Sequence, residues 1–156
     1  MMLLRPMRAD EFAAYLDYFI PDYAAEIVAN YRLSESEARE QARREISVSL
    51  PDGVNSAGHV LLCLVDSAKH PDNALGYLWY KADAAMREAF IYDFYIHPDH
   101  QGKGLGKQAL QLLGEALKAR GFAQIKLRVA GDNERARHLY EVSGFQVTGI
   151  NMSKPL

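Results

Sequence analysis

The chain has 156 residues, of which 49% are hydrophobic and 24% are charged, and its formal net charge is -2. This composition is typical of a globular protein and excludes a collagen, a coiled coil and a disordered chain. We expect one domain over residues 1–156, because a chain of this length buries one core rather than two.

The distribution of charge indicates which partners to exclude, and the cysteine content indicates the state of the thiol. Lys and Arg (18) nearly balance Asp and Glu (20) and spread along the chain, so we expect neither nucleic acid nor a membrane surface as a partner. The single cysteine, Cys63, lies in the apolar run Val60 to Val65, where a buried, unreactive thiol is expected. Residues 1–10 carry Arg5 and Arg8 and no long apolar stretch, which predicts a cytoplasmic protein without a signal peptide or membrane span.

The first third of the chain is predicted to be helical. Residues 10–30 have a helical pattern that we expect to be interrupted at Pro21. Ser34 and Glu37 form a capping box at the start of a second helix. Its apolar positions are spaced by four: Ala38, Ala42 and Ile46.

The rest of the chain alternates between strand and helix patterns. Turn-rich connections at residues 51–58 and 67–73 are expected to join elements rather than domains. The predicted elements are strands at 60–65, 75–80 and 90–96, a helix at 105–117, a strand at 125–129, a short helix at 133–143 and a last strand at 145–150. This order predicts a mixed α/β fold around one sheet that is antiparallel in its first three strands.

A glycine-rich loop, residues 101–107, separates the strand at 90–96 from the next helix. Its glycines let the backbone approach a ligand closely, and the helix N-terminus presents free amides and a positive dipole end. Lys103 and Lys107 add positive charge, so the loop suits a phosphate or pyrophosphate. The structural alternative is a tight connection whose glycines serve only the turn.

Two nucleotide-binding motifs fit this loop less well. A P-loop is excluded, because Gln101 occupies the position of the motif's first glycine. Gln108 occupies the position of the serine or threonine that would bind magnesium. A dinucleotide fingerprint is matched by Gly104, Gly106 and Ala109. However, it comes late in the chain and lacks an acidic residue about 20 positions further on, so it remains a weaker alternative.

The loop and a second segment together resemble the GNAT superfamily of N-acetyltransferases. The loop is similar to the family's acetyl-CoA motif at Pro98, Gln101, Gly104 and Gly106. The family's later N-x-x-A-x-x-x-Y-x-x-x-G-F pattern is matched by Asn133, Ala136, Tyr140, Gly144 and Phe145. The resemblance covers residues 90–145 and implies a GNAT-like acyl-CoA N-acyltransferase fold, with a mostly antiparallel central sheet flanked by helices. It also implies transfer of an acetyl group from acetyl-CoA to a primary amine by direct attack in a ternary complex.

The same resemblance implies which residues hold the cofactor. The backbone of the strand before the loop would pair with the pantetheine arm, and the loop amides would hold the pyrophosphate. Asn133 would contact the arm, and it is also a good helix N-cap. The implied cofactor-binding residues are Phe94, Ile96, Gln101, Gly102, Lys103, Gly104, Leu105, Gly106, Lys107, Asn133 and Ala136.

Two residues are candidates for the chemistry. The resemblance assigns Tyr140 as the acid that protonates the leaving thiolate, although a core tyrosine is the structural alternative. Asp93 is our candidate base, because an acid is out of place in the middle of an apolar strand, and a structural ion or hydrogen-bond partner is equally consistent. Glu88 and Tyr92 are other possible bases, and His97 is expected to be solvated or to fix the backbone.

The acceptor pocket is expected between the front helices and the strand ends. Aromatic residues there form either pocket or core: Tyr15, Tyr18, Phe19, Tyr23, Tyr31, Trp79 and Tyr80. The motifs do not distinguish among amino acids, polyamines, antibiotics, peptide N-termini and lysines as the acceptor.

The histidines do not have the spacing of metal ligands, so no metal site is expected. Family members often dimerise through the sheet edge, and a non-catalytic acyl-CoA-binding regulatory module or a dinucleotide-binding protein remains an alternative.

Overall fold

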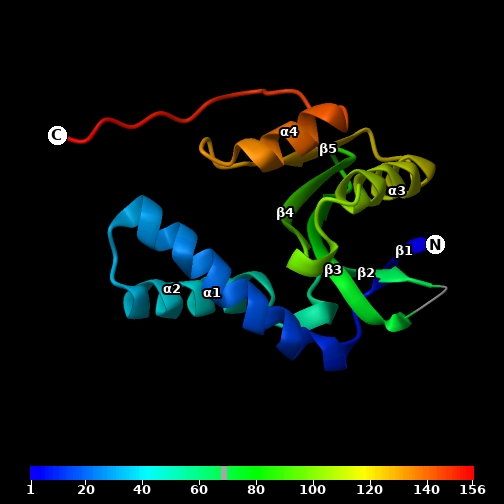
Figure 1. Ribbon diagram of the computed structural model, residues 1–156, viewed down its shortest axis with the longest axis horizontal. Coiled ribbons are helices and arrows are strands. Elements are labelled where there is room, and N and C mark those ends of the chain that lie inside the picture. The colour runs from blue at the N-terminus through cyan, green and yellow to red at the C-terminus, as the bar shows by residue number, and fades with distance from the viewer. Residues whose placement is uncertain (68–69) are drawn as a thin grey trace.

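The computed structural model describes residues 1–67 and 70–156, and within them a five-stranded sheet separates two pairs of α-helices (Figure 1). The strands are β1 (Met2–Pro6), β2 (His59–Asp66), β3 (His70–Asp83), β4 (Glu88–Ile96) and β5 (Gln124–Leu127). The helices are α1 (Phe12–Tyr31), α2 (Glu35–Ser49), α3 (Leu105–Ala119) and α4 (Glu134–Val142), with 3-10 turns at Ala9–Glu11, Gly53–Asn55 and Pro98–His100.

The strands lie side by side in chain order, from β1 to β5. Each of the first four is antiparallel to its neighbour, whereas β4 and β5 are parallel and are joined by α3. This arrangement confirms the predicted mixed α/β fold, with a mostly antiparallel sheet flanked by helices.

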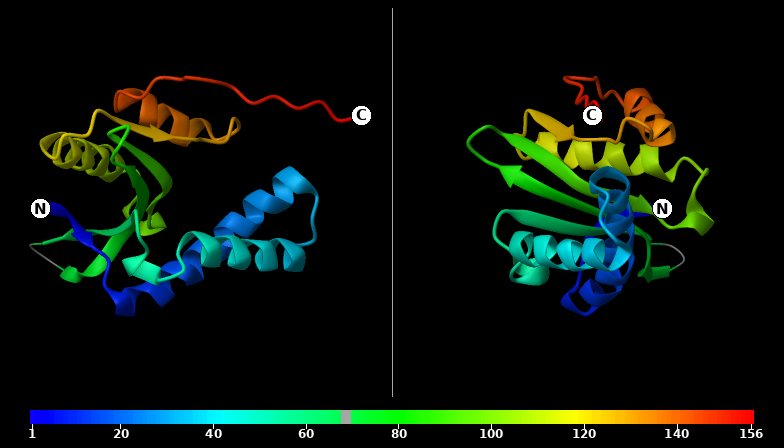
Figure 2. Two further views of the ribbon diagram at one scale, coloured as in Figure 1. Left: turned by 180° about the vertical axis from the view of Figure 1, so that it is seen from behind. Right: turned by 90° about the vertical axis from the view of Figure 1, so that its left-hand side faces the viewer.

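Each face of the sheet carries its own hydrophobic core. On one face α3 and α4 pack against the strands, with Leu64, Leu78 and Leu113 buried between them. On the other face α1 and α2 cover a core that contains Tyr15 and Cys63. Figure 2 shows the two helix pairs on opposite sides of the sheet. Cys63 is fully buried, and burial together with the nearby Glu11 carboxylate raises the pKa of its thiol to about 12, as expected for an unreactive cysteine.

The front helices differ from the prediction at one position. The predicted interruption at Pro21 is wrong, because α1 continues through it to Tyr31. Proline removes one backbone hydrogen bond, but Tyr15, Ala24 and Ile27 bury the helix on both sides of Pro21 and hold it together. Ser34 is the N-cap of α2, and its hydroxyl accepts a hydrogen bond from the Glu37 amide at 3.2 Å. The second bond of the predicted capping box differs, because the Glu37 carboxylate accepts from the Ser34 hydroxyl, at 2.7 Å, and not from the Ser34 amide.

Strand β1 was not predicted, because Arg5 and Pro6 interrupt its apolar pattern. It lies at the edge of the sheet, where a proline is tolerated, and it pairs with β2 from Met2 to Pro6. The Arg5 guanidinium donates to both carboxylate oxygens of Glu11, at 2.8 and 2.9 Å. This bidentate ion pair ties β1 to the turn that starts α1, and it lowers the pKa of Glu11 to about 2.

The predicted last strand at residues 145–150 is not formed. After α4 the described chain has no regular structure, and Figure 1 shows it running outward to the C-terminus. Val147 and Ile150 are 55% and 77% exposed, so their β-branched side chains find no neighbouring strand to pack on. Part of the predicted connection at residues 67–73 is also different: β3 begins at His70, and Ala68 and Lys69 lie outside the described residues.

Candidate active site

The sheet opens between β4 and β5. Strand β4 pairs with β3 as far as Ile96, which lies opposite Gly76. Its pairing with β5 ends much earlier, at Ile91 and Leu127. Among the described residues, the β5-facing edge of β4 therefore has no strand partner from Tyr92 to Ile96. This edge includes Phe94 and Ile96, the residues expected to pair with the pantetheine arm.

An irregularity in β4 determines where Asp93 points. Asp93 lies opposite Trp79, while Ile91 lies opposite the next residue, Tyr80, so Tyr92 is an extra residue in the strand. Such a β-bulge reverses the in-and-out alternation of side chains. Ile91 and Phe94 consequently pack on the same face of the sheet, and Asp93 is directed toward α1.

Two tyrosines of α1 hold the Asp93 carboxylate. The Tyr15 hydroxyl donates to its Oδ2 atom at 2.8 Å, and the Tyr18 hydroxyl donates to its Oδ1 atom at 3.0 Å. Burial raises the pKa of Asp93 to about 7, although both hydrogen bonds act in the opposite direction. A carboxyl group with this pKa changes its protonation state near neutral pH, as a general base is required to do.

Asp93 lies at the wall of a cavity of about 490 Å³ between the sheet and the front helices. The cavity is lined from four elements by Phe19, Asp22, Tyr23, Glu26, Arg44, Glu45, Ile46, Val48, Ser49, Trp79, Tyr92 and Asp93. The Trp79 ring is fixed in this wall, because its Nε1 donates to His59 Nδ1 at 3.0 Å and its ring stacks on Tyr92.

The aromatic residues predicted for an acceptor pocket divide into three groups. Phe19, Tyr23 and Trp79 line the cavity, while Tyr15 and Tyr18 bind Asp93 beside it. The other two do not line this cavity. Tyr80 packs on the opposite face of the sheet with the α3 core, because neighbouring strand residues point to opposite faces. Tyr31 is 68% exposed at the end of α1.

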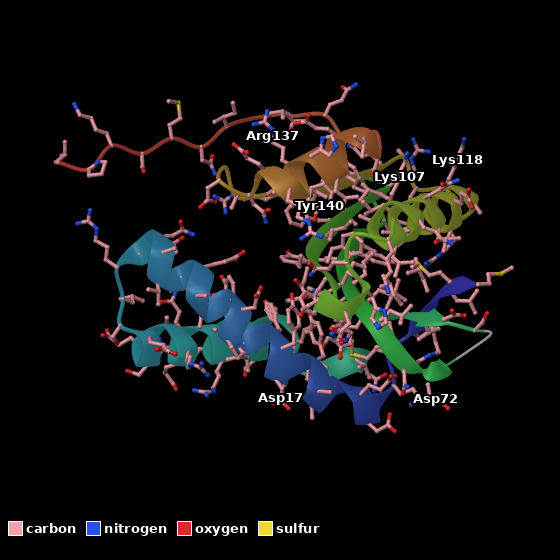
Figure 3. The ribbon with its side chains drawn as sticks, viewed as in Figure 1. Asp17, Asp72, Lys107, Lys118, Arg137 and Tyr140 are labelled. Atoms are coloured by element: carbon pink, nitrogen blue, oxygen red, sulfur yellow. The ribbon has the colours of Figure 1, made fainter. Side chains whose placement is uncertain are left out.

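The glycine-rich loop runs from the end of β4 into the first turn of α3. Gly102 and Gly104 have positive φ angles of 75° and 77°, which glycine adopts without strain. Gly104 is the N-cap of α3, so the first amide to donate within the helix is that of Gln108. The amides of residues 105–107 are therefore free to bind an anion, and Lys107 lies in the same turn (Figure 3).

Two residues of this loop have structural roles that the motif alone does not imply. The Gln101 side chain donates to the Ile96 carbonyl at 2.8 Å and so fixes the end of β4. At Gly106 a Cβ atom would stand 3.0 Å from the Leu139 side chain of α4. A glycine at this position allows α3 and α4 to approach each other closely.

Helix α4 carries the second motif. Asn133 is its N-cap, and the Asn133 side chain accepts a hydrogen bond from the Ala136 amide at 3.1 Å. Tyr140 is partly buried against the core on the α3 side, with its ring edge-on to Phe145 at 5.6 Å. Burial and the charge of Asp93 raise the pKa of Tyr140 to about 12, so its hydroxyl keeps its proton near neutral pH.

The other candidates for a base are placed differently. Glu88 lies at the far end of β4, where it pairs with Lys126 at 3.1 Å and accepts from Gln124. Tyr92 lines the cavity. His97 is partly buried between the rings of Tyr77 and Tyr95, at 5.3 Å from each, rather than solvated.

Two features are absent from the described residues. No helix among them is long and apolar enough to cross a bilayer. In the same residues, no group of three or more His, Cys, Asp or Glu side chains is placed to hold a metal ion.

Comparison with known proteins identifies the family. The model of the family described as acetyltransferase (GNAT) family matches residues 15–145 of the chain. The chain belongs to this GNAT acetyltransferase family.

Relatives of the GNAT family match almost the whole chain. The Bacillus subtilis protein named uncharacterized N-acetyltransferase YycN is 36% identical to this chain, and the match covers 99% of each chain. Its crystal structure matches the structure of this chain with a TM-score of 0.91. A second B. subtilis relative, uncharacterized N-acetyltransferase YdgE, is 31% identical over 98% of this chain and 97% of its own. The PaiA N-acetyltransferase of Thermoplasma acidophilum, solved in complex with coenzyme A, shares the fold with a TM-score of 0.72. The match covers 97% of this chain and 93% of the PaiA chain, at 17% sequence identity.

The sequence did not reveal two parts of this GNAT site. The hydroxyls of Tyr15 and Tyr18 were expected only as aromatic surface, and nothing in their spacing points to Asp93, which is more than 70 residues away. Asp22 and Glu26 were not singled out at all. Their spacing of four residues places both on one helix face, but the expected break at Pro21 hid their alignment with Tyr18, which precedes the proline.

Replacing Tyr18 with phenylalanine tests how Asp93 is held. We expect Tyr18→Phe to raise the pKa of Asp93 by about one pH unit, because a hydrogen bond to the charged form is lost. An NMR titration of the Asp93 carboxyl carbon would measure this pKa. Tyr92→Phe is the matched control, since Tyr92 is the neighbour of Asp93 in the cavity wall but does not bond to its carboxylate. An equal pKa in wild type and Tyr18→Phe would contradict the assigned role.

Proposed function

We propose that this protein transfers the acetyl group of acetyl-CoA to a primary amine by direct attack in a ternary complex. The observation that carries the proposal is the open edge of β4, which leads into the free amides at the start of α3 and lies next to Asp93. Family membership supports acyl transfer, and the open edge supports a thioester cofactor with a long polar arm.

The cofactor would bind along two backbone surfaces. The pantetheine arm carries amide groups that can pair with the backbone of β4 at Phe94 and Ile96, which has no strand partner on this edge, as an added strand does. The pyrophosphate would meet the loop backbone, where the amides of residues 105–107 are free, and the charge of Lys103 and Lys107. Asn133 and Ala136, at the start of α4, would border the arm from the other side. Because backbone amides and their dipoles would bind the pyrophosphate, a net charge of -2 does not prevent the binding of an anionic cofactor.

Asp93 is proposed as the general base. An alkylammonium acceptor must lose a proton before its nitrogen can attack the thioester carbon. The acceptor would enter through the cavity, which ends at Asp93. With a pKa of about 7, the Asp93 carboxylate is ionised in roughly half of the molecules at neutral pH and can accept this proton.

Tyr140 is proposed as the general acid. As the new C–N bond forms, the C–S bond breaks and its electron pair goes to the sulfur of coenzyme A. The Tyr140 hydroxyl, whose pKa is raised to about 12, would donate the proton that turns this thiolate into a thiol. Tyr140 then regains a proton from solvent, while Asp93 releases the proton that it accepted and the acylated nitrogen releases its second one, so that one proton is released to solvent overall. The products are the N-acetylated amine and coenzyme A.

Ligand-induced stabilisation tests the cofactor. Thermal unfolding with acetyl-CoA, coenzyme A, NADH and ATP in parallel should show stabilisation by the two CoA compounds, of about 2.7 kcal/mol at 100 times the dissociation constant. Lys107→Gln should weaken this effect. Lys118→Gln is its matched control, because Lys118 lies at the opposite end of the same helix (Figure 3). Stabilisation by NADH alone, or by none of the four, would exclude the proposal.

Removal of the Asp93 charge tests the base. For wild type we expect kcat to fall about tenfold per pH unit below pH 7, because the protonated carboxyl cannot accept a proton. Asp93→Asn should lower kcat by roughly a hundredfold or more and abolish this pH dependence. Release of coenzyme A thiol gives the rate, and Asp17→Asn, an exposed change on α1, is the control. A variant with the wild-type pH profile would assign Asp93 to structure alone.

Removal of the Tyr140 hydroxyl tests the acid. Tyr140→Phe should lower kcat by about tenfold to a hundredfold and leave the KM for acetyl-CoA nearly unchanged, because the proton is needed only as the C–S bond breaks. Tyr80→Phe is the matched control, since this buried tyrosine packs in the same core away from the cavity. Unchanged turnover of Tyr140→Phe over the full pH range, at saturating substrates, would refute the role.

A further inference from the structure

The cavity beside Asp93 is strongly acidic. Four of its lining residues are carboxylates, namely Asp22, Glu26, Glu45 and Asp93, whereas Arg44 is its only basic lining residue in the described chain. This excess contrasts with the near balance of charge over the whole sequence. A concave site with such an excess attracts cations.

Two of these carboxylates form no ion pair and no side-chain hydrogen bond with the described residues. In the part of the chain that the structure describes, neither Asp22 nor Glu26 forms an ion pair or a side-chain hydrogen bond. Burial raises the pKa of both. The charge of Asp22 raises the pKa of Glu26 further, and the positive charge of Arg128 opposes this without outweighing it. Partly desolvated like charges at an (i, i+4) spacing destabilise the protein unless a cation neutralises them.

The carboxylates form a line with the group that holds the proposed base. Tyr18, Asp22 and Glu26 are spaced by four residues on α1, so their side chains form one stripe along the helix. Tyr18 marks the level of Asp93, to which it donates at 3.0 Å. With a rise of 1.5 Å per residue, Asp22 and Glu26 lie about 6 Å and about 12 Å further along the helix axis. Both charges act on Asp93. Burial is the largest cause of its raised pKa, and the charges of Asp22 and Glu26 raise this pKa further.

The remaining walls suit an alkyl chain that carries a cation. Phe19, Tyr23, Trp79 and Tyr92 line the cavity, and the Trp79 and Tyr92 rings stack at 4.9 Å. Aromatic faces attract ammonium groups and pack against methylene chains. The cavity therefore combines apolar walls with two carboxylates, Asp22 and Glu26, that form no ion pair with the described residues and lie at a fixed distance from Asp93.

We infer that the acceptor is a dicationic amine: one amino group reacts at Asp93, and a second ammonium group, separated from it by an alkyl chain, binds Asp22 and Glu26. This inference rests on the proposed function, which it makes more specific. Asp22 and Glu26 are specificity-determining residues that act on the far end of the acceptor, without touching the reacting atoms.

A matched pair of acceptors tests the inference. In 1,4-diaminobutane and n-pentylamine the reacting ends are the same, but the second ammonium group of the diamine is replaced by a methyl group. For wild type we expect kcat/KM, measured by thiol release from acetyl-CoA at constant ionic strength, to be at least tenfold higher for the diamine. The Asp22→Asn/Glu26→Gln double variant should bring this ratio close to one, mostly through KM for the diamine. Neutralising two repelling carboxylates does not remove a contact that the fold needs, so this variant should fold.

The control is a carboxylate elsewhere on the same helix. Asp17 is exposed, and Figure 3 shows it on the side of α1 that faces away from α4. Asp17→Asn changes the net charge without changing the cavity, so it should retain the wild-type preference for the diamine. A similar loss of preference in Asp17→Asn would mean that overall charge, and not the cavity, selects the acceptor.

A binding measurement separates the two proposals. Thermal unfolding with each amine alone should show stabilisation of wild type by 1,4-diaminobutane, little effect of n-pentylamine, and loss of the diamine effect in the double variant. Equal turnover of both amines without diamine-specific stabilisation would overturn the inference and leave the acetyltransferase proposal standing. Diamine-specific stabilisation that depends on Asp22 and Glu26, without thiol release from any amine, would support the dication site and contradict the proposed transfer.

Discussion

The site depends on one extra residue in β4. Because Tyr92 has no counterpart in β3, the strand changes its alternation between Ile91 and Phe94. Asp93 is thereby turned to the face that α1 covers, within reach of two tyrosine hydroxyls. In a regular strand Asp93 would share the face of Ile91 and would be buried against the apolar α3 core, where an unpaired acid is very costly. The bulge makes an acid at this position compatible with the fold.

The protonation state of Asp93 results from opposing influences that come from different elements. Burial disfavours its charge most strongly, the Tyr15 and Tyr18 hydroxyls favour it, and the charges of Asp22 and Glu26 disfavour it again. The outcome is a pKa of about 7, well above that of a solvated aspartic acid. Four of these five residues belong to α1. This helix therefore both positions the proposed base and sets the charge of the cavity beside it.

The opposite side of the sheet provides the proposed cofactor surface. There the backbone contributes more than the side chains: the open edge of β4, the free amides of the first turn of α3 and the N-cap of α4. Gly106 connects α3 to α4, because the absence of a side chain lets the Leu139 side chain of α4 pack close to α3. A backbone surface of this kind also explains how an acidic protein could bind a polyanionic cofactor.

The sequence by itself determined the fold class, most of the elements and the GNAT relation, since apolar periodicity and local motifs act over a few residues. It also indicated Asp93 as a candidate general base and Tyr140 as a candidate general acid. It could not predict β1, which has no apolar alternation, nor the absence of a strand after Phe145, which depends on whether a neighbouring strand is available. Only the tertiary structure decided the bulge at Tyr92, the two hydrogen bonds to Asp93 and the alignment of Tyr18 with Asp22 and Glu26 through Pro21. Each of these depends on the pairing of segments far apart in the chain, or on packing that overrides a local helix-breaking signal.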